Sequence, residues 1–105
     1  MTDLEMTRAC AESMGYIFQK ENEYAPGILV TGIVDDISRY DPLHDGAQAM
    51  ALLYWLMDEG EIILTADEFH FNSDEHKMDE IYVVRSQEML RRAIVECVAK
   101  LKGRP

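Results

Sequence analysis

At residues 40–50 the chain reads YDPLHDGAQAM, and this stretch decides where its central helix begins. The tyrosine ends an extended segment that Pro42 cannot continue, because proline has no backbone N–H to donate. Asp41 can be the N-cap of a helix with Pro42 at its first position. Alternatively, Asp45 is the N-cap and Gln48 follows three residues later. Both alternatives predict that an extended segment turns into a helix here.

The body of this helix, residues 47–57, is apolar on nearly every side. A surface helix of a globular protein has a polar face. We therefore expect this helix either to lie inside the core or to combine a core face with an interaction face. Tyr54, Trp55 and Met57 are the candidates for an oligomer interface, such as that of a homodimer, because aromatic residues and methionine are favoured at interface cores.

Capping signals mark two further helices, one at each end of the chain. Thr2 and Glu5 have the spacing of a capping box, and Gly15 is a natural stop for the first helix. Ser86 is an N-cap candidate, and Glu88 in the next turn suits the helix dipole. The helix after Ser86 has an apolar stripe made of Leu90, Ala93, Ile94, Cys97, Val98 and Leu101.

The segments between the helices are predicted to be strands. Turn signals lie at residues 24–27 and at Asp35-Asp36, and β-branched residues are frequent between them. We expect strands at residues 16–21, 28–34, 37–40, 61–65, 69–71 and 81–84, and a polar loop at 72–79. This order predicts a single α+β domain, residues 1–105, with a mainly antiparallel sheet of four to five strands covered by three helices. An α/β/α three-layer sandwich fits the apolar central helix.

Length and composition limit the class of protein. The chain has 105 residues, 48% of them hydrophobic, which is enough for one core without metals or disulfides. No apolar run reaches the length of a membrane span, and the N-terminus does not resemble a signal peptide, so we expect an intracellular protein. Cys10 and Cys97 each lie among apolar helix positions, which predicts buried free thiols rather than a disulfide.

The charge of the chain is strongly acidic and unevenly distributed. Twenty acidic and ten basic residues give a net charge of −10. Residues 1–84 hold 18 acids and four bases, a balance of −14, whereas residues 85–105 hold two acids and six bases, a balance of +4. Such a field repels nucleic acid and anionic lipid and favours a basic protein surface. Alternatively, the acidic surface only keeps the protein soluble and has no specific partner.

Most of the acidic doublets are concentrated between residues 58 and 80. If neighbouring elements place them on one edge of the sheet, their carboxylates present a surface resembling nucleic acid to a basic partner. The alternative is a solvated rim of turns. The predicted partner-binding acidic edge consists of Asp58, Glu59, Glu61, Asp67, Glu68, Asp74, Glu75, Asp79 and Glu80.

Catalytic and cofactor motifs are not found in the sequence. It has no nucleophile elbow, P-loop or dinucleotide fingerprint, so we predict no catalytic residues, no cofactor and no metal. His44 lies beside two aspartates that suit cap and turn positions. The densest group of potential metal ligands is His70, Asp74, Glu75 and His76, which a polar loop would leave solvated.

Four blocks of the chain resemble the phage ABA-sandwich domain family, small proteins of tailed phages and prophages. The blocks are residues 3–7, 10–15, 40–50 and 90–100, which read DLEMT, CAESMG, YDPLHDGAQAM and LRRAIVECVAK. The matched residues are cap, stripe and turn positions, so the resemblance concerns the fold. It implies a phage or prophage origin and leaves the central strands and the acidic segment unaccounted for.

These features together predict a non-enzymatic phage or prophage accessory protein in the bacterial cytoplasm. It would bind the basic surface of a nucleic-acid-binding protein. In the most specific version of this hypothesis, the protein inhibits a host CRISPR or restriction complex. Neither nucleic acid nor a membrane is an expected partner. Two alternatives stay open: a small metal-dependent enzyme or metal-binding protein that uses His70 and His76, and a structural or oligomerising phage component.

Overall fold

The computed structural model describes residues 1–33 and 36–103, and within them the chain forms three helices and six strands. The helices are α1 (Asp3–Ser13), α2 (Gly46–Glu59) and α3 (Gln87–Lys102). The first antiparallel sheet consists of β1 (Ile17–Glu21), β2 (Ile28–Thr31) and β3 (Ser38–Tyr40). The second consists of β4 (Glu61–Leu64), β5 (Glu68–Ser73) and β6 (Met78–Val83).

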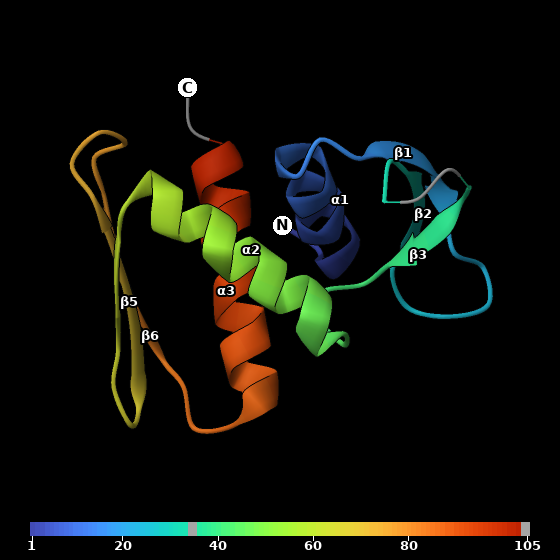
Figure 1. Cartoon of the computed structure of the whole chain (residues 1–105). Helices are drawn as coiled ribbons and strands as arrows, with labels where there is room; N and C mark the ends of the chain where they lie inside the picture. The colour runs from blue at the N-terminus through green and yellow to red at the C-terminus, as the bar shows by residue number, and fades with distance from the viewer. Residues whose placement is uncertain (34–35, 104–105) are drawn as a thin grey trace.

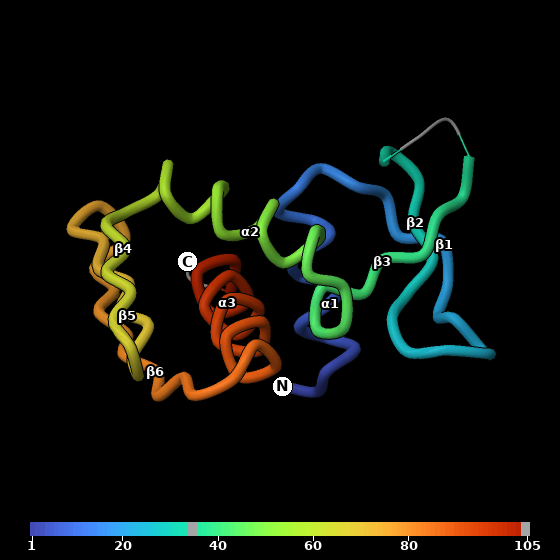
Figure 2. Tube along the Cα trace, turned by 60° about the horizontal axis from the view of Figure 1, so that its bottom comes forward, coloured from blue at the N-terminus to red at the C-terminus, as the bar shows by residue number. Residues whose placement is uncertain are grey.

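The helices lie in the middle of the molecule, and the two sheets lie at opposite ends (Figures 1 and 2). α3 packs against α1 and α2, α1 covers β1 and β2, and the second sheet packs against α2 and α3. The prediction of an α+β fold with antiparallel strands is therefore confirmed. The predicted single sheet of four to five strands with helices on both faces does not form, because six strands are divided between two sheets with the helices between them.

α2 connects the two sheets. Its 14 residues span about 21 Å, since an α-helix rises about 1.5 Å per residue. β3 ends just before this helix and β4 begins just after it, at Glu61. The helix thus carries the chain from one end of the molecule to the other, so β3 and β4 join different sheets.

α3 is the centre of the core, because other elements contact it on several sides. The predicted stripe is buried, apart from the half-buried Leu90, and Val95 and Ala99 are buried as well. Phe69 and Phe71 from β5 and Met78 from β6 join the same cluster. Among the described residues, no helix combines the length and the apolar character needed to cross a membrane.

The three helix N-termini follow the local capping signals. The hydroxyl of Thr2 accepts a hydrogen bond from the Glu5 backbone N–H, and that of Ser86 accepts one from Met89 (both 3.1 Å). At α2 the second alternative is confirmed, because the N-cap is Asp45, whose carboxylate accepts from the Gln48 N–H at 3.0 Å.

The segment predicted as a polar loop, residues 72–79, is mostly strand. β5 continues to Ser73 and β6 begins at Met78, so only four residues, 74–77, form the turn. The prediction was wrong because it followed polarity alone. Ser73 is buried and donates a hydrogen bond to the Glu59 carbonyl at 2.8 Å, and Met78 is buried in the core. In the first sheet, the predicted strand 28–34 and turn 35–36 include Val34 and Asp35, which lie outside the described residues.

Candidate functional site

The outer face of the second sheet carries a row of exposed apolar side chains. Along β5, Phe69, Phe71 and Ser73 are buried, so the alternate residues point to the other face of the sheet. The strand register places Ile63 and Ile81 on either side of His70, and Val83 opposite Glu68. Ile63, Ile81 and Val83 are 48%, 58% and 53% exposed. Sequence analysis missed this row, although both faces of β4 and β6 contain apolar residues.

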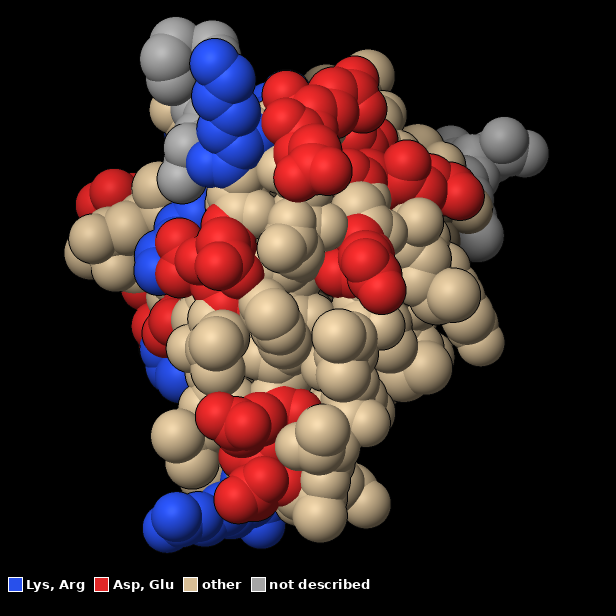
Figure 3. Space-filling model, turned by 90° about the vertical axis from the view of Figure 1, so that its left-hand side faces the viewer, with Lys and Arg blue, Asp and Glu red and all other residues tan. Residues whose placement is uncertain are grey.

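Acidic residues lie at both ends of this apolar row. At one end, Glu61 and Asp79 flank Asn72 in the register, and the end of α2 and the β5–β6 turn add further carboxylates from Asp58, Glu59, Asp74 and Glu75. At the other end, Asp67 and Glu68 lie at the β4–β5 turn. Figure 3 shows acidic side chains along the upper part of this face and at its lower end, with an uncharged band between them. We call this surface the acid-rimmed face.

The structure therefore brings eight of the nine predicted acidic residues to the two ends of the second sheet, but it does not place them in one continuous row. The rows of Glu68 and Asn72 are four residues apart along β5, or roughly 14 Å. Glu80 belongs to the opposite face of the sheet, where Lys100 of α3 donates a hydrogen bond to its carboxylate at 3.3 Å.

Four of the nine carboxylates are engaged in contacts within the protein. Besides Glu80, these are Asp79 with His70 (2.6 Å), Glu59 with His76 (2.8 Å), and Asp67, which accepts a weak hydrogen bond from Thr65. The side chains of the other five have no ion-pair partner among the described residues: Asp58, Glu61, Glu68, Asp74 and Glu75. These five are available to an external cation.

The two histidines considered as metal ligands are in different places. His70 lies on the acid-rimmed face and pairs with Asp79, whereas His76 lies in the β5–β6 turn and pairs with Glu59. Within residues 1–33 and 36–103, no three histidine, cysteine or acidic side chains are arranged to hold a metal ion. Each histidine instead holds one carboxylate in position.

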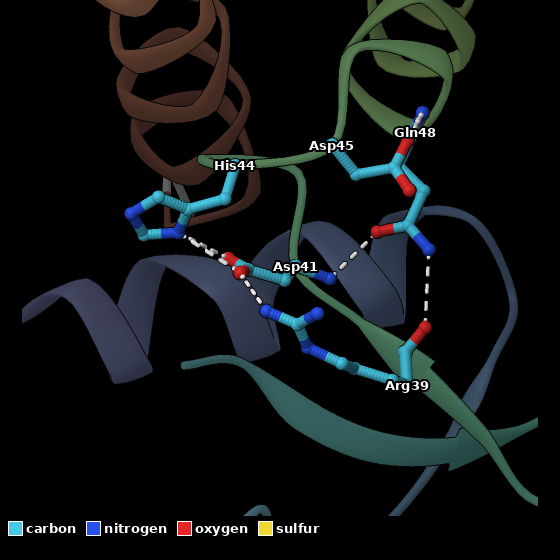
Figure 4. Close-up of a pocket in the computed structure, with 5 residues that line it drawn as sticks. All are labelled: Arg39, Asp41, His44, Asp45 and Gln48. Carbon is cyan, nitrogen blue, oxygen red and sulfur yellow. Dashed lines mark hydrogen bonds and ion pairs between the residues drawn. The ribbon is translucent and has the colours of Figure 1, made fainter. Parts of the chain in front are cut away.

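A small polar pocket of about 220 Å³ lies where β3 leads into α2, and His44 and Asp41 meet there (Figure 4). The buried carboxylate of Asp41 accepts hydrogen bonds from the Arg39 guanidinium at 2.8 Å and from Nδ1 of His44 at 2.9 Å. The backbone N–H of Asp41 donates to the Gln48 side chain at 2.6 Å, and Gln48 donates to the Arg39 carbonyl at 3.1 Å.

This arrangement explains the pocket as a structural corner. Both oxygens of the Asp41 carboxylate are occupied by its neighbours, and the other lining acid, Asp45, caps α2. The residues that line the pocket include no hydroxyl or thiol nucleophile. The pocket therefore stabilises the turn from β3 into α2.

The candidate oligomer residues on α2 point in different directions. Tyr54 and Met57 are exposed, at 63% and 58%, whereas Trp55 is half-buried against the core cluster. Met50, at 40%, is also exposed and was missed. Its spacing of four residues from Tyr54 could have indicated a shared helix face.

Both cysteines are buried free thiols. Burial raises the pKa of Cys10 and of Cys97 to about 12, because the core disfavours the charged thiolate. At pH 8 only about one thiol in 10⁴ is then ionised, and the thiolate is the reactive form. We expect the native protein not to react with Ellman's reagent (DTNB) over an hour at pH 8, and both thiols to react within minutes in 6 M guanidinium chloride. Rapid reaction of either thiol in native protein would contradict this assignment.

Comparisons with protein-family models, curated proteins and solved structures give no match for this chain. Its function is therefore inferred from the acid-rimmed face itself.

Proposed function

We propose that this protein is a non-enzymatic accessory protein that binds a basic protein surface through the acid-rimmed face. One observation carries the proposal: exposed apolar residues in the centre of a sheet face, with acidic residues at both ends. Protein interfaces have this arrangement, in which an apolar centre excludes water and a charged rim determines the partner. Ile63 and Ile81 would be the centre, and Val83 would extend the apolar surface toward Glu68.

The partner is expected to be basic because of the charge on this face and on the whole chain. Five carboxylates on the face have no ion-pair partner among the described residues, and the net charge is −10. This field accelerates the approach of a cationic surface and opposes nucleic acid. Lysine- and arginine-lined grooves that normally hold DNA or RNA offer such a surface.

The sharper form of the proposal is inhibition of a host defence complex, such as a CRISPR or restriction enzyme, in the bacterial cytoplasm. The support is the resemblance of residues 40–50 and 90–100 to the phage ABA-sandwich domain family, together with the acidic charge. By occupying the groove that binds nucleic acid, the acid-rimmed face would exclude the substrate of the complex.

The first test is capture of partners from a bacterial lysate by the immobilised protein, at 0.05 M and at about 0.5 M salt, where the screening length is only a few ångströms. We expect a nucleic-acid-binding protein to be retained at low salt, released at high salt and displaced by added DNA. Retention that is equal at both salt concentrations, or unaffected by DNA, would contradict the proposal.

A pair of charge-matched variants then locates the binding surface. Glu61→Lys/Glu68→Lys changes two unpaired carboxylates of the acid-rimmed face, and Glu21→Lys/Glu23→Lys changes two exposed carboxylates near the first sheet. Two reversals add four charges to −10, so both variants have a net charge of −6. We expect the first variant to bind the captured protein about tenfold more weakly or worse, and the control to lose much less. Equal losses would mean that net charge alone determines binding.

A further inference from the structure

α2 carries two apolar stripes, and only one of them faces the core. The inner stripe, Ala49, Leu52 and Leu56, is fully buried, and the helix packs with this side against α3 and β4. The outer stripe consists of Ala47, Met50, Tyr54 and Met57, all of which are exposed. In Figure 1, α2 crosses in front of α3, and no other element lies in front of it.

The spacing of the outer stripe is that of a helix-pairing seam. The intervals between its residues are three, four and three, which repeat every seven residues. Such a 3-4-3 pattern places all four side chains along one line of the helix surface, where a second helix can pack. No charged side chain has to be desolvated along this line, since residues 46–57 contain none.

The absence of charge points to a second copy of this chain as the occupant. Two copies, each with a net charge of −10, repel each other wherever their acidic surfaces meet. The acid-rimmed face is unsuitable for self-association for this reason, although its centre is apolar. The outer stripe of α2 allows two copies to meet without bringing carboxylates together along its length.

Side-chain size and terminal charge determine the direction of pairing. In an antiparallel pair, the small Ala47 lies opposite the long Met57 of the partner subunit, and Met50 lies opposite Tyr54 of the partner subunit. A parallel pair would instead place each residue against its own copy and bring together the acidic C-terminal ends, with Asp58 and Glu59 from both subunits. At the N-terminal end of α2, the charges of Asp41 and Asp45 are balanced by Arg39 and Arg91, so this end is less acidic.

We propose that the protein forms a two-fold symmetric homodimer in which the outer stripes of two α2 helices pack antiparallel. A two-fold interface is self-complementary, as the Ala47–Met57 and Met50–Tyr54 pairs require. The seam from Ala47 to Met57 is only about 15 Å long, so the interface is small and the dimer is expected to be weak and concentration-dependent. The acid-rimmed face remains free in this dimer, and the inference does not rest on the proposed function.

Sedimentation equilibrium of the purified protein, from about 10 µM to 1 mM, tests the association. We expect the dimer fraction to rise with concentration and also with salt between 0.05 and 0.5 M, because salt screens the repulsion between two acidic subunits. Binding of a basic partner has the opposite salt dependence, so the two proposals can fail separately. A monomer throughout this concentration range at 0.5 M salt would overturn the dimer.

Two lysine variants identify the surface used. Tyr54→Lys places a charge in the outer stripe, and Ile81→Lys places the same charge at a similarly exposed apolar position on the acid-rimmed face. We expect Tyr54→Lys to weaken dimerisation about tenfold or more and Ile81→Lys to leave it nearly unchanged. The reverse result, or equal effects, would overturn the assignment to α2.

Engineered cysteines test the antiparallel direction. Under mild oxidation, a mixture of Ala47→Cys and Met57→Cys proteins should form a mixed disulfide, whereas each variant alone should remain largely uncrosslinked. Cys10 and Cys97 are fully buried and do not compete. If each variant instead crosslinks to itself and not to the other, the helices are parallel and the proposed pairing is wrong.

Discussion

Replacing Gly27 with alanine is expected to lower the free energy of unfolding by about 3 kcal/mol or more, the sum of a backbone cost of roughly 1–2 kcal/mol and a steric cost of roughly 1–3 kcal/mol. Gly27 has a φ of +96°, which side-chain-bearing residues rarely adopt. A Cβ at this position would lie 2.5 Å from the Tyr40 carbonyl oxygen and 2.7 Å from the Asp41 Cβ. Urea unfolding followed by circular dichroism measures the effect.

The contact at Gly27 is important because it joins the β1–β2 loop to the beginning of the stretch that leads into α2. The neighbouring Pro26 carbonyl accepts a hydrogen bond from the Arg39 guanidinium at 2.9 Å, and Arg39 also pairs with Asp41. A side chain at residue 27 would push these two segments apart and disturb both bonds. Backbone atoms cannot move aside as a flexible side chain can.

Gly15→Ala is the matched control for Gly27→Ala. Gly15 also has a positive φ, +79°, but a Cβ there would have no neighbour within 4 Å. We therefore expect the free energy of unfolding of this variant to fall only by the cost of the backbone conformation, about 1–2 kcal/mol. Equal losses of stability in the two variants would contradict the placement of residue 27 in close contact with Tyr40 and Asp41.

Leu56→Ala is expected to destabilise the protein by about 3 kcal/mol, within the range of 2–5 kcal/mol observed when buried leucines are truncated. Leu56 is fully buried on the inner stripe of α2, in the same core cluster as residues of α3. Its removal would leave a cavity that the surrounding helices can fill only partly. The measurement is again the urea midpoint, at a protein concentration where monomer predominates.

Met57→Ala, one residue further along α2, is the control for the orientation of this helix. Met57 is 58% exposed, so its truncation should change the stability of the monomer by less than about 0.5 kcal/mol. The same variant should weaken the α2–α2 dimer. A loss of monomer stability as large as that of Leu56→Ala would mean that α2 is rotated about its axis relative to the structure described.

The helices were largely predictable, and the sheets only in part. The caps at Thr2 and Ser86 and the apolar stripe of α3 were identified correctly, because each depends on residues a few positions apart. The loop predicted at residues 72–79 failed, since its polar residues alternate between a solvent face and contacts with α2, such as that of Ser73 with the Glu59 carbonyl. Polarity alone does not distinguish a solvated loop from an edge of a sheet.

For the candidate site, the sequence identified charges but not their neighbours. It named nine acidic residues, whereas the grouping of Glu61 with Asp79 and the separation of Glu80 follow from strand register. The apolar row of Ile63 and Ile81 beside His70 follows from the same register. A shift of one residue in any strand would move its side chains to the other face, and the register depends on partners in other strands.

The sequence by itself determined the N-termini of α1 and α3, the acidic character of the chain and the α+β class, and it limited the N-cap of α2 to Asp41 or Asp45. These properties depend on composition and on contacts between residues three or four positions apart, as with the Asp45 carboxylate and the Gln48 N–H. Tertiary structure alone decided that six strands form two sheets and that α2 buries Leu52 and Leu56 while it exposes Tyr54. Because α2 is apolar on nearly every side, its sequence pattern favours no orientation, and only packing against α3 and β4 selects one.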